Sequence, residues 1–260
     1  MKWFFGFNEE TEWFDNYSRY IKCAVNSAIN NTNLEPNFIY DGKPNELTKW
    51  LEGKGVTIWN VRSRFYDVFQ KRSEQGLNAK VASGAYLRAE IPDLVDTDSV
   101  VLYTDCDVMF LGDVSALSVM RPKHFACAPE FDQNNWTYFN SGVMVMNCSA
   151  MRQKMPQFER LIYSSSAQTL SKSYDQYTYN ELYKGRWDKL SPEYNWKPYW
   201  GLNPNAKIIH FHGIKVENIE RVFRGESVQP IQAQLFGKSP EAYKEFYELA
   251  IKYELELRGM

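Results

Sequence analysis

The sequence contains few cysteines, and they lie far apart, at positions 23, 106, 127 and 148 of 260 residues. No Cys-x-x-Cys pair occurs, which argues against a structural zinc site and against a disulfide framework. Long apolar runs are also absent, since none approaches the roughly 20 residues that a membrane-spanning helix needs. The aromatic N-terminal segment is too short for the apolar part of a signal peptide. We therefore expect a soluble protein of a reducing compartment, the cytoplasm.

An excess of either charge is missing as well. The chain has 30 basic and 32 acidic residues mixed along its length, for a net charge of −2. It lacks the basic stripe that nucleic-acid-binding proteins usually carry, so nucleic acid is not an expected partner. Aromatic residues are frequent, at 16%. Tyrosine and tryptophan suit sugar or base recognition, but they fill cores equally well.

Strand-like and helical patterns alternate through the first quarter of the chain. Apolar runs bounded by turn residues are typical of strands, and segments with helical spacing lie between them. The predicted order is strand 2–7, helix 11–30, strand 37–42, helix 44–55 and strand 56–61. This rhythm indicates a parallel sheet with crossover helices.

The rest of the chain continues the alternation. Further helices are predicted at 78–90, 151–165, 174–185 and 240–257, and further strands at 124–130, 138–149 and 206–213. No repeat, low-complexity segment or linker interrupts the pattern. The sequence therefore predicts the α/β class, with a mixed, mostly parallel central sheet flanked by helices. We expect a single domain over 1–260, with a nucleotide-type half at about 1–115 and an elaborated half at about 116–260.

Two aspartates stand where an apolar run ends. In "VVLYTDCDVMFLGD" (100–113), Asp105 and Asp107 follow a run that is typical of a buried strand. Each carboxylate would cost several kcal/mol to bury without a partner. Ligands collect outside the carboxyl ends of parallel strands, and carboxylate oxygens are preferred ligands of Mg²⁺ and Mn²⁺. The alternative is a pair of loop acids that cap a helix or face solvent.

A second polar cluster follows a later apolar run. "AKIIHFHGIK" (206–215) contains two of the three histidines, His210 and His212, and then Gly213 and Lys215. An imidazole beside two carboxylates suits Mn²⁺, but strand alternation puts both histidines on one face, so spacing does not choose the ligand. Gly213 would let the backbone approach a phosphate, and Lys215 would supply a compact positive charge. The alternative is two histidines held by hydrogen bonds in the core.

Taken in order, these segments resemble glycosyltransferase family 8, the group of glycogenin and the bacterial lipopolysaccharide galactosyl- and glucosyltransferases. The matching pieces are "YLRAEIPDLV", "VVLYTDCDVMFLGD", "CAPE…YFNSGVMVMN", "YDQYTYN…WDKLSPEYNW" and "KIIHFHGIK", over about residues 80–215. The resemblance implies a GT-A fold and a nucleotide-sugar donor, usually linked to UDP. It also implies Mn²⁺ (or Mg²⁺) and retention of the anomeric configuration.

The resemblance also implies roles for particular residues. Asp105 and Asp107 match the metal-binding pair, and His210 matches the third ligand. Asp175 and Gln176 match the Asp-Gln pair on the reacting face of the sugar, where we expect the catalytic residues. The residues implied to contact the donor are Phe7, Asn8 and Glu9 at the uracil and ribose, Arg88, Gly213 and Lys215 at the diphosphate, and Glu130, Asn140 and Ser141 at the sugar. The last motif departs from many relatives, because "GIKVEN" lacks their Pro-Trp.

The function implied is transfer of a hexosyl unit from a UDP-sugar to the hydroxyl of a glycan or glycoconjugate. No second catalytic carboxylate is obvious, so a covalent intermediate and a same-face displacement assisted by the leaving phosphate both stay open. One alternative is a non-catalytic protein that binds a nucleotide sugar or glycan on the same scaffold. A nucleotidyltransferase is disfavoured, because "FGFNEETEW" holds no Gly-rich phosphate loop with Arg and Lys.

Overall fold

The computed structural model describes residues 1–11, 13–96 and 99–255. They form two compact units, each assembled from separated stretches of the chain. The first unit comprises Met1–Phe14, Glu35–Asp105 and Ala116–Leu190, and the second comprises Asp15–Leu34, Cys106–Ser115 and the chain from Ser191 onward. The single domain with two halves that the sequence suggests stays a prediction.

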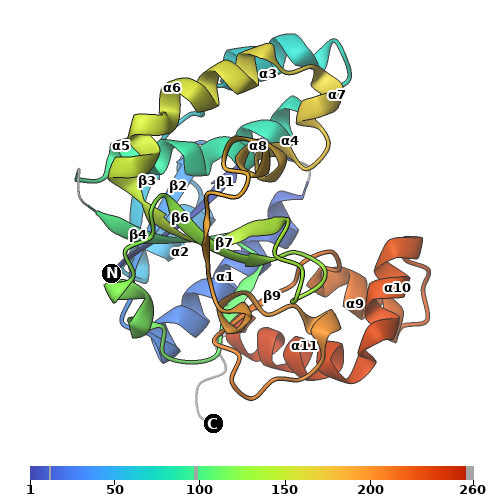
Figure 1. The fold of residues 1–260 in the computed structure, drawn as a ribbon. Coiled ribbons are helices and arrows are strands. Elements are labelled where there is room, and N and C mark those ends of the chain that lie inside the picture. The colour runs from blue at the N-terminus through green and yellow to red at the C-terminus, as the bar shows by residue number, and fades with distance from the viewer. Residues whose placement is uncertain (12, 97–98, 256–260) are drawn as a thin grey trace. The chain divides into compact units, whose positions relative to one another are not determined.

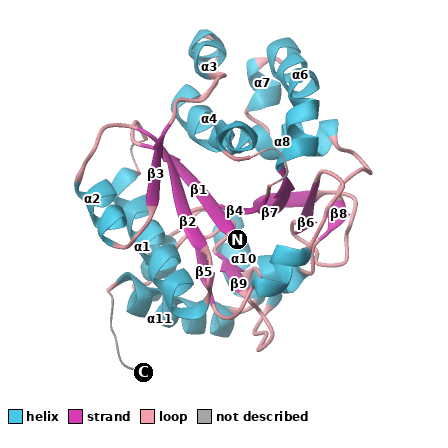
Figure 2. Cartoon of the chain, turned by 90° about the vertical axis from the view of Figure 1, so that its left-hand side faces the viewer, coloured by secondary structure: helices cyan, strands magenta, loops and turns pink. Residues whose placement is uncertain are grey.

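The first unit is built on a mixed sheet. Within the described residues this sheet has seven strands in the order β3-β2-β1-β4-β7-β6-β8 (Figure 2). The strands are β1 (Lys2–Asn8), β2 (Glu35–Asp41), β3 (Thr57–Asn60), β4 (Val100–Thr104), β6 (Phe125–Pro129), β7 (Phe139–Asn147) and β8 (Asp188–Lys189). Strands β3, β2, β1 and β4 pair in parallel, as do β6 and β8, so the mostly parallel sheet predicted from the sequence is confirmed.

Strand β7 runs against its neighbours β4 and β6. Because of this reversal, the amino end of β7 lies beside the carboxyl end of β4, where Thr104 pairs with Val143. The backbone N–H of Asp105 donates to the carbonyl of Gly142 over 2.8 Å. One strand thus brings residues 140–142 to the edge at which the acidic pair begins.

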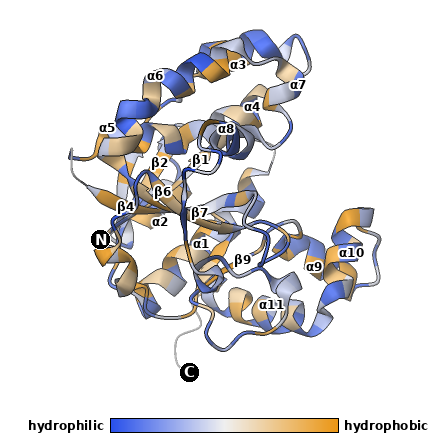
Figure 3. Cartoon of the chain, viewed as in Figure 1, coloured by the Kyte–Doolittle hydropathy of each residue, from blue (hydrophilic) through white to orange (hydrophobic). Residues whose placement is uncertain are grey.

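Helices α3, α4, α6 and α8 of the first unit pack in two layers on one side of this sheet, and α2 lies on the other side (Figure 1). Helices α4 and α8 contact strands β1 and β7, while α3 contacts α4 and α6 contacts α8 (Figure 1). The helices of this unit are α2 (Glu46–Gly53), α3 (Tyr66–Ser73), α4 (Ala79–Ala85), α5 (Ile91–Leu94), α6 (Cys148–Ser164), α7 (Ala167–Leu170) and α8 (Tyr174–Leu182). Hydrophilic and hydrophobic residues alternate along α3 and α6 (Figure 3), and the buried core between the layers includes Phe4, Tyr86, Met144 and Phe158.

The helix predicted over 78–90 changes from α-helical to 3₁₀ geometry after Ala85. Helix α4 ends at Ala85, and Tyr86–Glu90 forms a 3₁₀ helix before α5. Pro92 has no N–H, so it cannot close an α-helical bond to the carbonyl of Arg88. The N–H of Ile91 donates to that carbonyl instead. The change of helix type therefore falls at the segment that carries Arg88.

The second unit combines a small antiparallel sheet with helices. Val108 pairs with His210 and Phe110 with Ile208 in the ladder of β5 and β9, which lie side by side (Figure 2). The elements are α1 (Phe14–Asn31, in this unit from Asp15), β5 (Val108–Phe110), β9 (Ile208–His210), the 3₁₀ helices Pro192–Asn195 and Pro198–Trp200, α9 (Val216–Phe223), α10 (Pro230–Lys238) and α11 (Pro240–Glu254). Its core includes Met109, Ile209, Phe211 and Tyr243.

The predicted helices at the two chain ends are found with slightly different bounds. Helix α1 begins at Phe14 rather than at residue 11, and α11 ends at Glu254. Residue 12 and residues 256–257 of these two predictions lie outside the described part of the chain. The remaining short 3₁₀ helix is Ser115–Val119. Within the described residues, none of the helices combines the length and apolar character that crossing a membrane would require.

Candidate active site

In the first unit, one cluster of candidate site residues centres on Arg88 and Asp105. Asp105 follows directly after β4, at the carboxyl end of its parallel strands, where ligands of α/β sheets bind. Arg88 is buried and donates through an Nη atom to Asp105 Oδ1 over 2.8 Å. The Tyr103 hydroxyl donates to the same oxygen over 3.0 Å, and the guanidinium lies 4.2 Å from the Tyr103 ring centre. Asp105 is therefore held in place by a buried cation and a phenol.

Arg88 also faces a second buried carboxylate, Asp175, in the first turn of α8. Arg88 Nε lies 2.7 Å from Asp175 Oδ2. Burial raises the pKa of Asp175 to about 7, and the positive charge of Arg88 opposes that rise. Within the described residues, neither of these two atoms makes a hydrogen bond despite the short separation. The Asp175 carboxyl group is therefore the buried ion-pair partner of Arg88.

Gln176 is the centre of a hydrogen-bond network that links the carboxyl end of β6 to the amino end of β7. Its Oε1 accepts from Asn140 Nδ2 and from the N–H of Ser141, both over 3.0 Å. Its Nε2 donates to Glu130 Oε1 over 2.7 Å. Glu130 follows β6 directly, and the carbonyl of Ser141 accepts from Arg88. The structure thus brings the predicted sugar-contacting and catalytic residues of this unit into one connected group with Arg88 and Asp105.

The predicted uracil and ribose segment lies at the carboxyl end of β1, the strand next to β4. Phe7 is buried and packs against Phe14 with ring centres 5.9 Å apart. Asn8 accepts from the N–H of Glu10 over 2.8 Å. The Glu9 carboxylate accepts from the Tyr40 hydroxyl over 2.8 Å and from the N–H of Lys43 over 2.9 Å. These side chains are therefore engaged within their own unit, separately from the Gln176 network.

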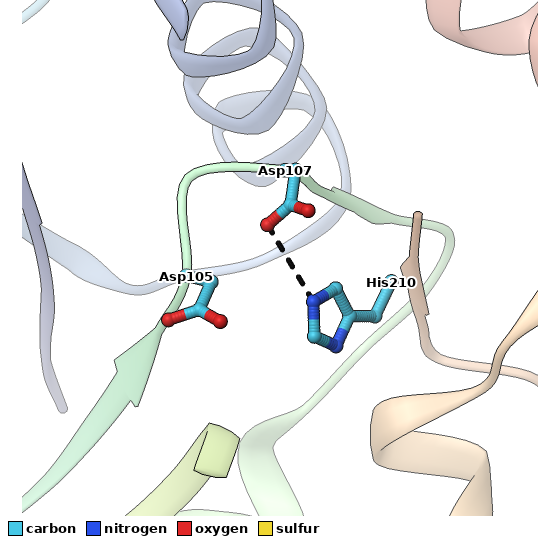
Figure 4. A group of neighbouring side chains, drawn as sticks. All are labelled: Asp105, Asp107 and His210. Carbon is cyan, nitrogen blue, oxygen red and sulfur yellow. Dashed lines mark ion pairs between the residues drawn. The ribbon is translucent and has the colours of Figure 1, made fainter. Parts of the chain in front are cut away.

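A second cluster of candidate site residues lies in the second unit, around Asp107. Asp107 immediately precedes β5, and His210 ends β9, which pairs with it. The N–H of Phe211 donates to the carbonyl of Asp107 over 3.0 Å, so the ladder continues one step beyond the strands. His210 Nε2 lies 3.5 Å from Asp107 Oδ1, and Figure 4 draws this ion pair together with Asp105. Both side chains are buried.

Lys215 places a positive charge beside Asp107. Its Nζ donates to Asp107 Oδ2 and, over 3.2 Å, to the carbonyl of Phe211. Burial opposes the ionisation of Asp107, but Lys215 and His210 outweigh it and hold the pKa of this carboxyl well below its usual range. The carboxylate is therefore anionic at neutral pH, as a metal ligand must be.

Gly213 lies between His210 and Lys215 at a position that favours glycine. Its φ is +83°, and a Cβ there would lie 2.5 Å from Leu235 Cδ1 of α10. Any other residue would be strained in this conformation, and the Leu235 side chain would have to shift. The space that a side chain would take at Gly213 is therefore filled by Leu235.

The two histidines of the cluster have different partners. His210 Nδ1 lies 3.0 Å from Asn195 Oδ1, whereas His212 Nδ1 lies 2.9 Å from the Tyr199 hydroxyl. Sequence reasoning missed Asn195, although the quoted "SPEYNW" contains it, because nothing in that segment links it to a histidine. It also missed Tyr103, which the two-residue spacing from Asp105 along an extended chain could have indicated.

The fold of this chain is that of the GT-A glycosyltransferases. The chain also matches the sequence profile of glycosyl transferase family 8 over residues 12–216. It therefore belongs to glycosyltransferase family 8, and the resemblance drawn from its motifs is confirmed. No curated protein sequence matches the chain.

Solved structures of several glycosyltransferases share this fold. The apo form of GlyE from Streptococcus pneumoniae matches with a TM-score of 0.63 and 17% identity, over 98% of this chain and 63% of GlyE, so the chain spans less than two thirds of that protein. The galactosyltransferase LgtC, solved with donor and acceptor sugar analogues, matches with a TM-score of 0.64 and 16% identity, over 97% of this chain and 96% of LgtC. Mouse xyloside xylosyltransferase 1 matches with a TM-score of 0.57 and 17% identity, over 82% and 98%.

Proposed function

We propose that the protein is a metal-dependent, retaining glycosyltransferase that moves a hexosyl unit from a UDP-sugar to a hydroxyl of a glycan or glycoconjugate. The observation that carries the proposal is the arrangement of the acidic pair. Asp105 is hydrogen-bonded to a buried arginine in one unit, and Asp107 is paired with His210 and Lys215 in the other. Family membership supports the same conclusion.

The proposed metal ligands are Asp105, Asp107 and His210. They offer carboxylate oxygens and an imidazole nitrogen, a donor set that suits Mn²⁺ and admits Mg²⁺. Only one residue separates the two aspartates, so their Cα atoms lie within about 7 Å of each other whatever the conformation of the chain. A bound cation would supply positive charge to the diphosphate as the glycosidic bond breaks.

The remaining donor contacts divide between the two units. In the second unit, the exposed backbone at Gly213 and the ammonium group of Lys215 are proposed to bind the diphosphate. In the first unit, Phe7, Asn8 and Glu9 are proposed to form the nucleoside side of the site. Because Arg88 is buried and hydrogen-bonded to Asp105, we propose that it orients this ligand and adds positive charge near the phosphates.

The sugar is proposed to bind against the Gln176 network. Asp175 Oδ2 and the Glu130 carboxylate can accept hydrogen bonds from sugar hydroxyls, and Asn140 is held beside them by Gln176. Gln176 Oε1 already accepts two hydrogen bonds, so its amide is firmly oriented. Transfer with retention then proceeds either through a covalent intermediate or on one face, with the leaving phosphate taking the acceptor's proton.

The decisive experiment is a donor screen. The purified protein is incubated with Mn²⁺ and a panel of UDP-sugars, and released UDP is measured with and without candidate acceptors. Metal-dependent release, including slow release to water, supports the transferase. Tight binding of a UDP-sugar without any release would instead identify a nucleotide-sugar-binding protein. The D105A variant is the control, because it removes one proposed ligand from the partly exposed edge of the site. A cytoplasmic location stays a prediction.

A further inference from the structure

We propose that Asn195 is a positioning residue that makes His210, rather than His212, the metal-ligating histidine. The proposal rests on the metal site proposed above. Asn195 has no solvent-exposed surface, and it ends the 3₁₀ helix Pro192–Asn195. Its Oδ1 lies 3.0 Å from His210 Nδ1, and all the residues involved belong to the second unit.

The backbone holds the two residues in register. The N–H of Trp196 donates to the carbonyl of Ile208 over 2.9 Å, and the N–H of His210 donates to the carbonyl of Trp196 over 2.8 Å. Trp196 therefore runs alongside β9 as an additional parallel bridge. Asn195 immediately precedes Trp196. The main-chain hydrogen bonds of Trp196 therefore fix the backbone position from which the Asn195 side chain reaches the His210 ring.

The chemistry of the amide then determines the tautomer of the imidazole. An amide oxygen only accepts hydrogen bonds, so the bond to Asn195 Oδ1 requires a proton on His210 Nδ1. In the neutral ring the lone pair then lies on Nε2. Nε2 is the nitrogen that faces Asp107 Oδ1, at 3.5 Å. Histidines that bind metals almost always donate their second N–H to an oxygen, which orients the ring and raises its basicity.

His212 does not have this constraint. Its Nδ1 lies 2.9 Å from the Tyr199 hydroxyl, which can donate or accept and so does not determine the position of the proton. His210 is almost fully buried beside Asp107, whereas His212 is only partly buried. Alternation along the strand could not distinguish the two histidines, but their hydrogen-bond partners do.

The test measures Mn²⁺ affinity directly, by calorimetry or by the EPR signal of free Mn²⁺, without any sugar nucleotide. N195L keeps the size of the side chain but cannot accept a hydrogen bond, and we expect its Mn²⁺ affinity to fall about 10- to 100-fold. N195D restores an oxygen acceptor at the same place, so it should bind Mn²⁺ at least as tightly as the wild type. In the metal-free wild type, ¹⁵N shifts of the imidazoles should show a proton on His210 Nδ1, whether or not Nε2 beside Asp107 also carries one.

A matched control separates positioning from general stability. Asn26 is also buried in the second unit, where its Nδ2 donates to the carbonyl of Tyr253 over 2.8 Å. N26L removes one buried amide hydrogen bond, as N195L does, so both should lower the melting temperature. We expect N26L to retain wild-type Mn²⁺ affinity.

The outcomes are distinguishable. Wild-type affinity in N195L, or a His210 ring without a proton on Nδ1, overturns the role of Asn195 even if the protein binds Mn²⁺ through Asp107. Wild-type affinity in H210A would show that His210 is not a ligand, which also overturns it. Failure of the wild type to bind Mn²⁺, or unchanged affinity in D107N, refutes the proposed metal site itself, and the role of Asn195 falls with it.

Discussion

Lys215 donates a hydrogen bond to Oδ2 of Asp107, while Oδ1 of the same carboxylate faces His210. The ammonium group and a divalent cation would therefore share one buried anion. A cation bound to Asp107 would weaken the ion pair between Lys215 and Asp107, and Lys215 would in turn oppose binding of the cation.

We expect K215M to bind Mn²⁺ about tenfold more tightly than the wild type in the absence of nucleotide, which corresponds to about 1.4 kcal/mol. Removing the ammonium group leaves Asp107 with less positive charge to compensate it, so the cation gains a stronger anionic ligand. UDP affinity at saturating Mn²⁺ should fall, because a cationic contact is lost. Both are measured by calorimetry. K244M, on an exposed position of α11, is the charge-matched control, and weaker Mn²⁺ binding in K215M would contradict the competition.

D105A should lower UDP-sugar turnover at least about 100-fold while the protein remains folded. A metal ligand contributes several kcal/mol to stabilising charge in the transition state, and each 1.36 kcal/mol corresponds to tenfold in rate. Arg88 retains Asp175 as its partner, at 2.7 Å, so no buried cation is left unpaired. Steady-state UDP release and circular dichroism together check the prediction. Near-normal turnover in D105A would refute the metal assignment.

R88A should be strongly destabilising, in contrast to D105A. The guanidinium is the partner of two carboxylates, and Asp175 would be left buried without a countercharge. Breaking a buried pair in this way typically costs about 3–5 kcal/mol. Urea unfolding of R88A and of R88A/D175N is the measurement. The double variant should recover part of the loss, and equal stability of the two variants would mean that the pair is not coupled.

G213A and G225A form a matched pair of backbone tests. Both glycines have positive φ, +83° and +74°, so alanine is strained at either position by about 1–2 kcal/mol. Only at Gly213 would the new Cβ meet a neighbour, Leu235 Cδ1 at 2.5 Å, whereas at Gly225 no described atom lies within 4 Å. G213A should therefore lose more stability in chemical denaturation than G225A. Adding L235A to G213A should relieve the clash but not the backbone strain.

Lowering the pH should destabilise the first unit through His124. Burial lowers the pKa of His124 below 6.5, and Lys154 and Lys123 act in the same direction, against the Arg186 carbonyl and Asp188. The unfolded chain therefore takes up the proton first, so stability is fully present above about pH 6.5 and is lost as the pH falls through that value. The free energy of unfolding, measured at pH 7.5 and 5.5, should fall further in the wild type than in H124N. Equal losses would assign the pH dependence to other groups.

The parts of the fold and site that could be predicted are those carried by local pattern. Apolar runs and helical spacing located most of the strands and helices but missed β5 and β8, and strand ends indicated Asp105 and His210 as candidate site residues. The direction of β7 could not be predicted, because an apolar strand has the same sequence pattern whether it pairs in parallel or antiparallel. The pairing of Asn195 with His210 and of Arg88 with Asp175 spans distant segments of the chain, so it required three-dimensional information.

Strand β7 also indicates where this protein tolerates redesign. It presents Asn140 and Ser141 to Gln176 at one end, and at the other Asn147 caps α6 by accepting from the N–H of Ala150. Adding or deleting one residue inside the strand would turn half of its side chains to the opposite face and disconnect one end from the other. The mostly exposed hairpin at 131–137 ahead of it is not bound by this alternation, so changes of length are best placed there.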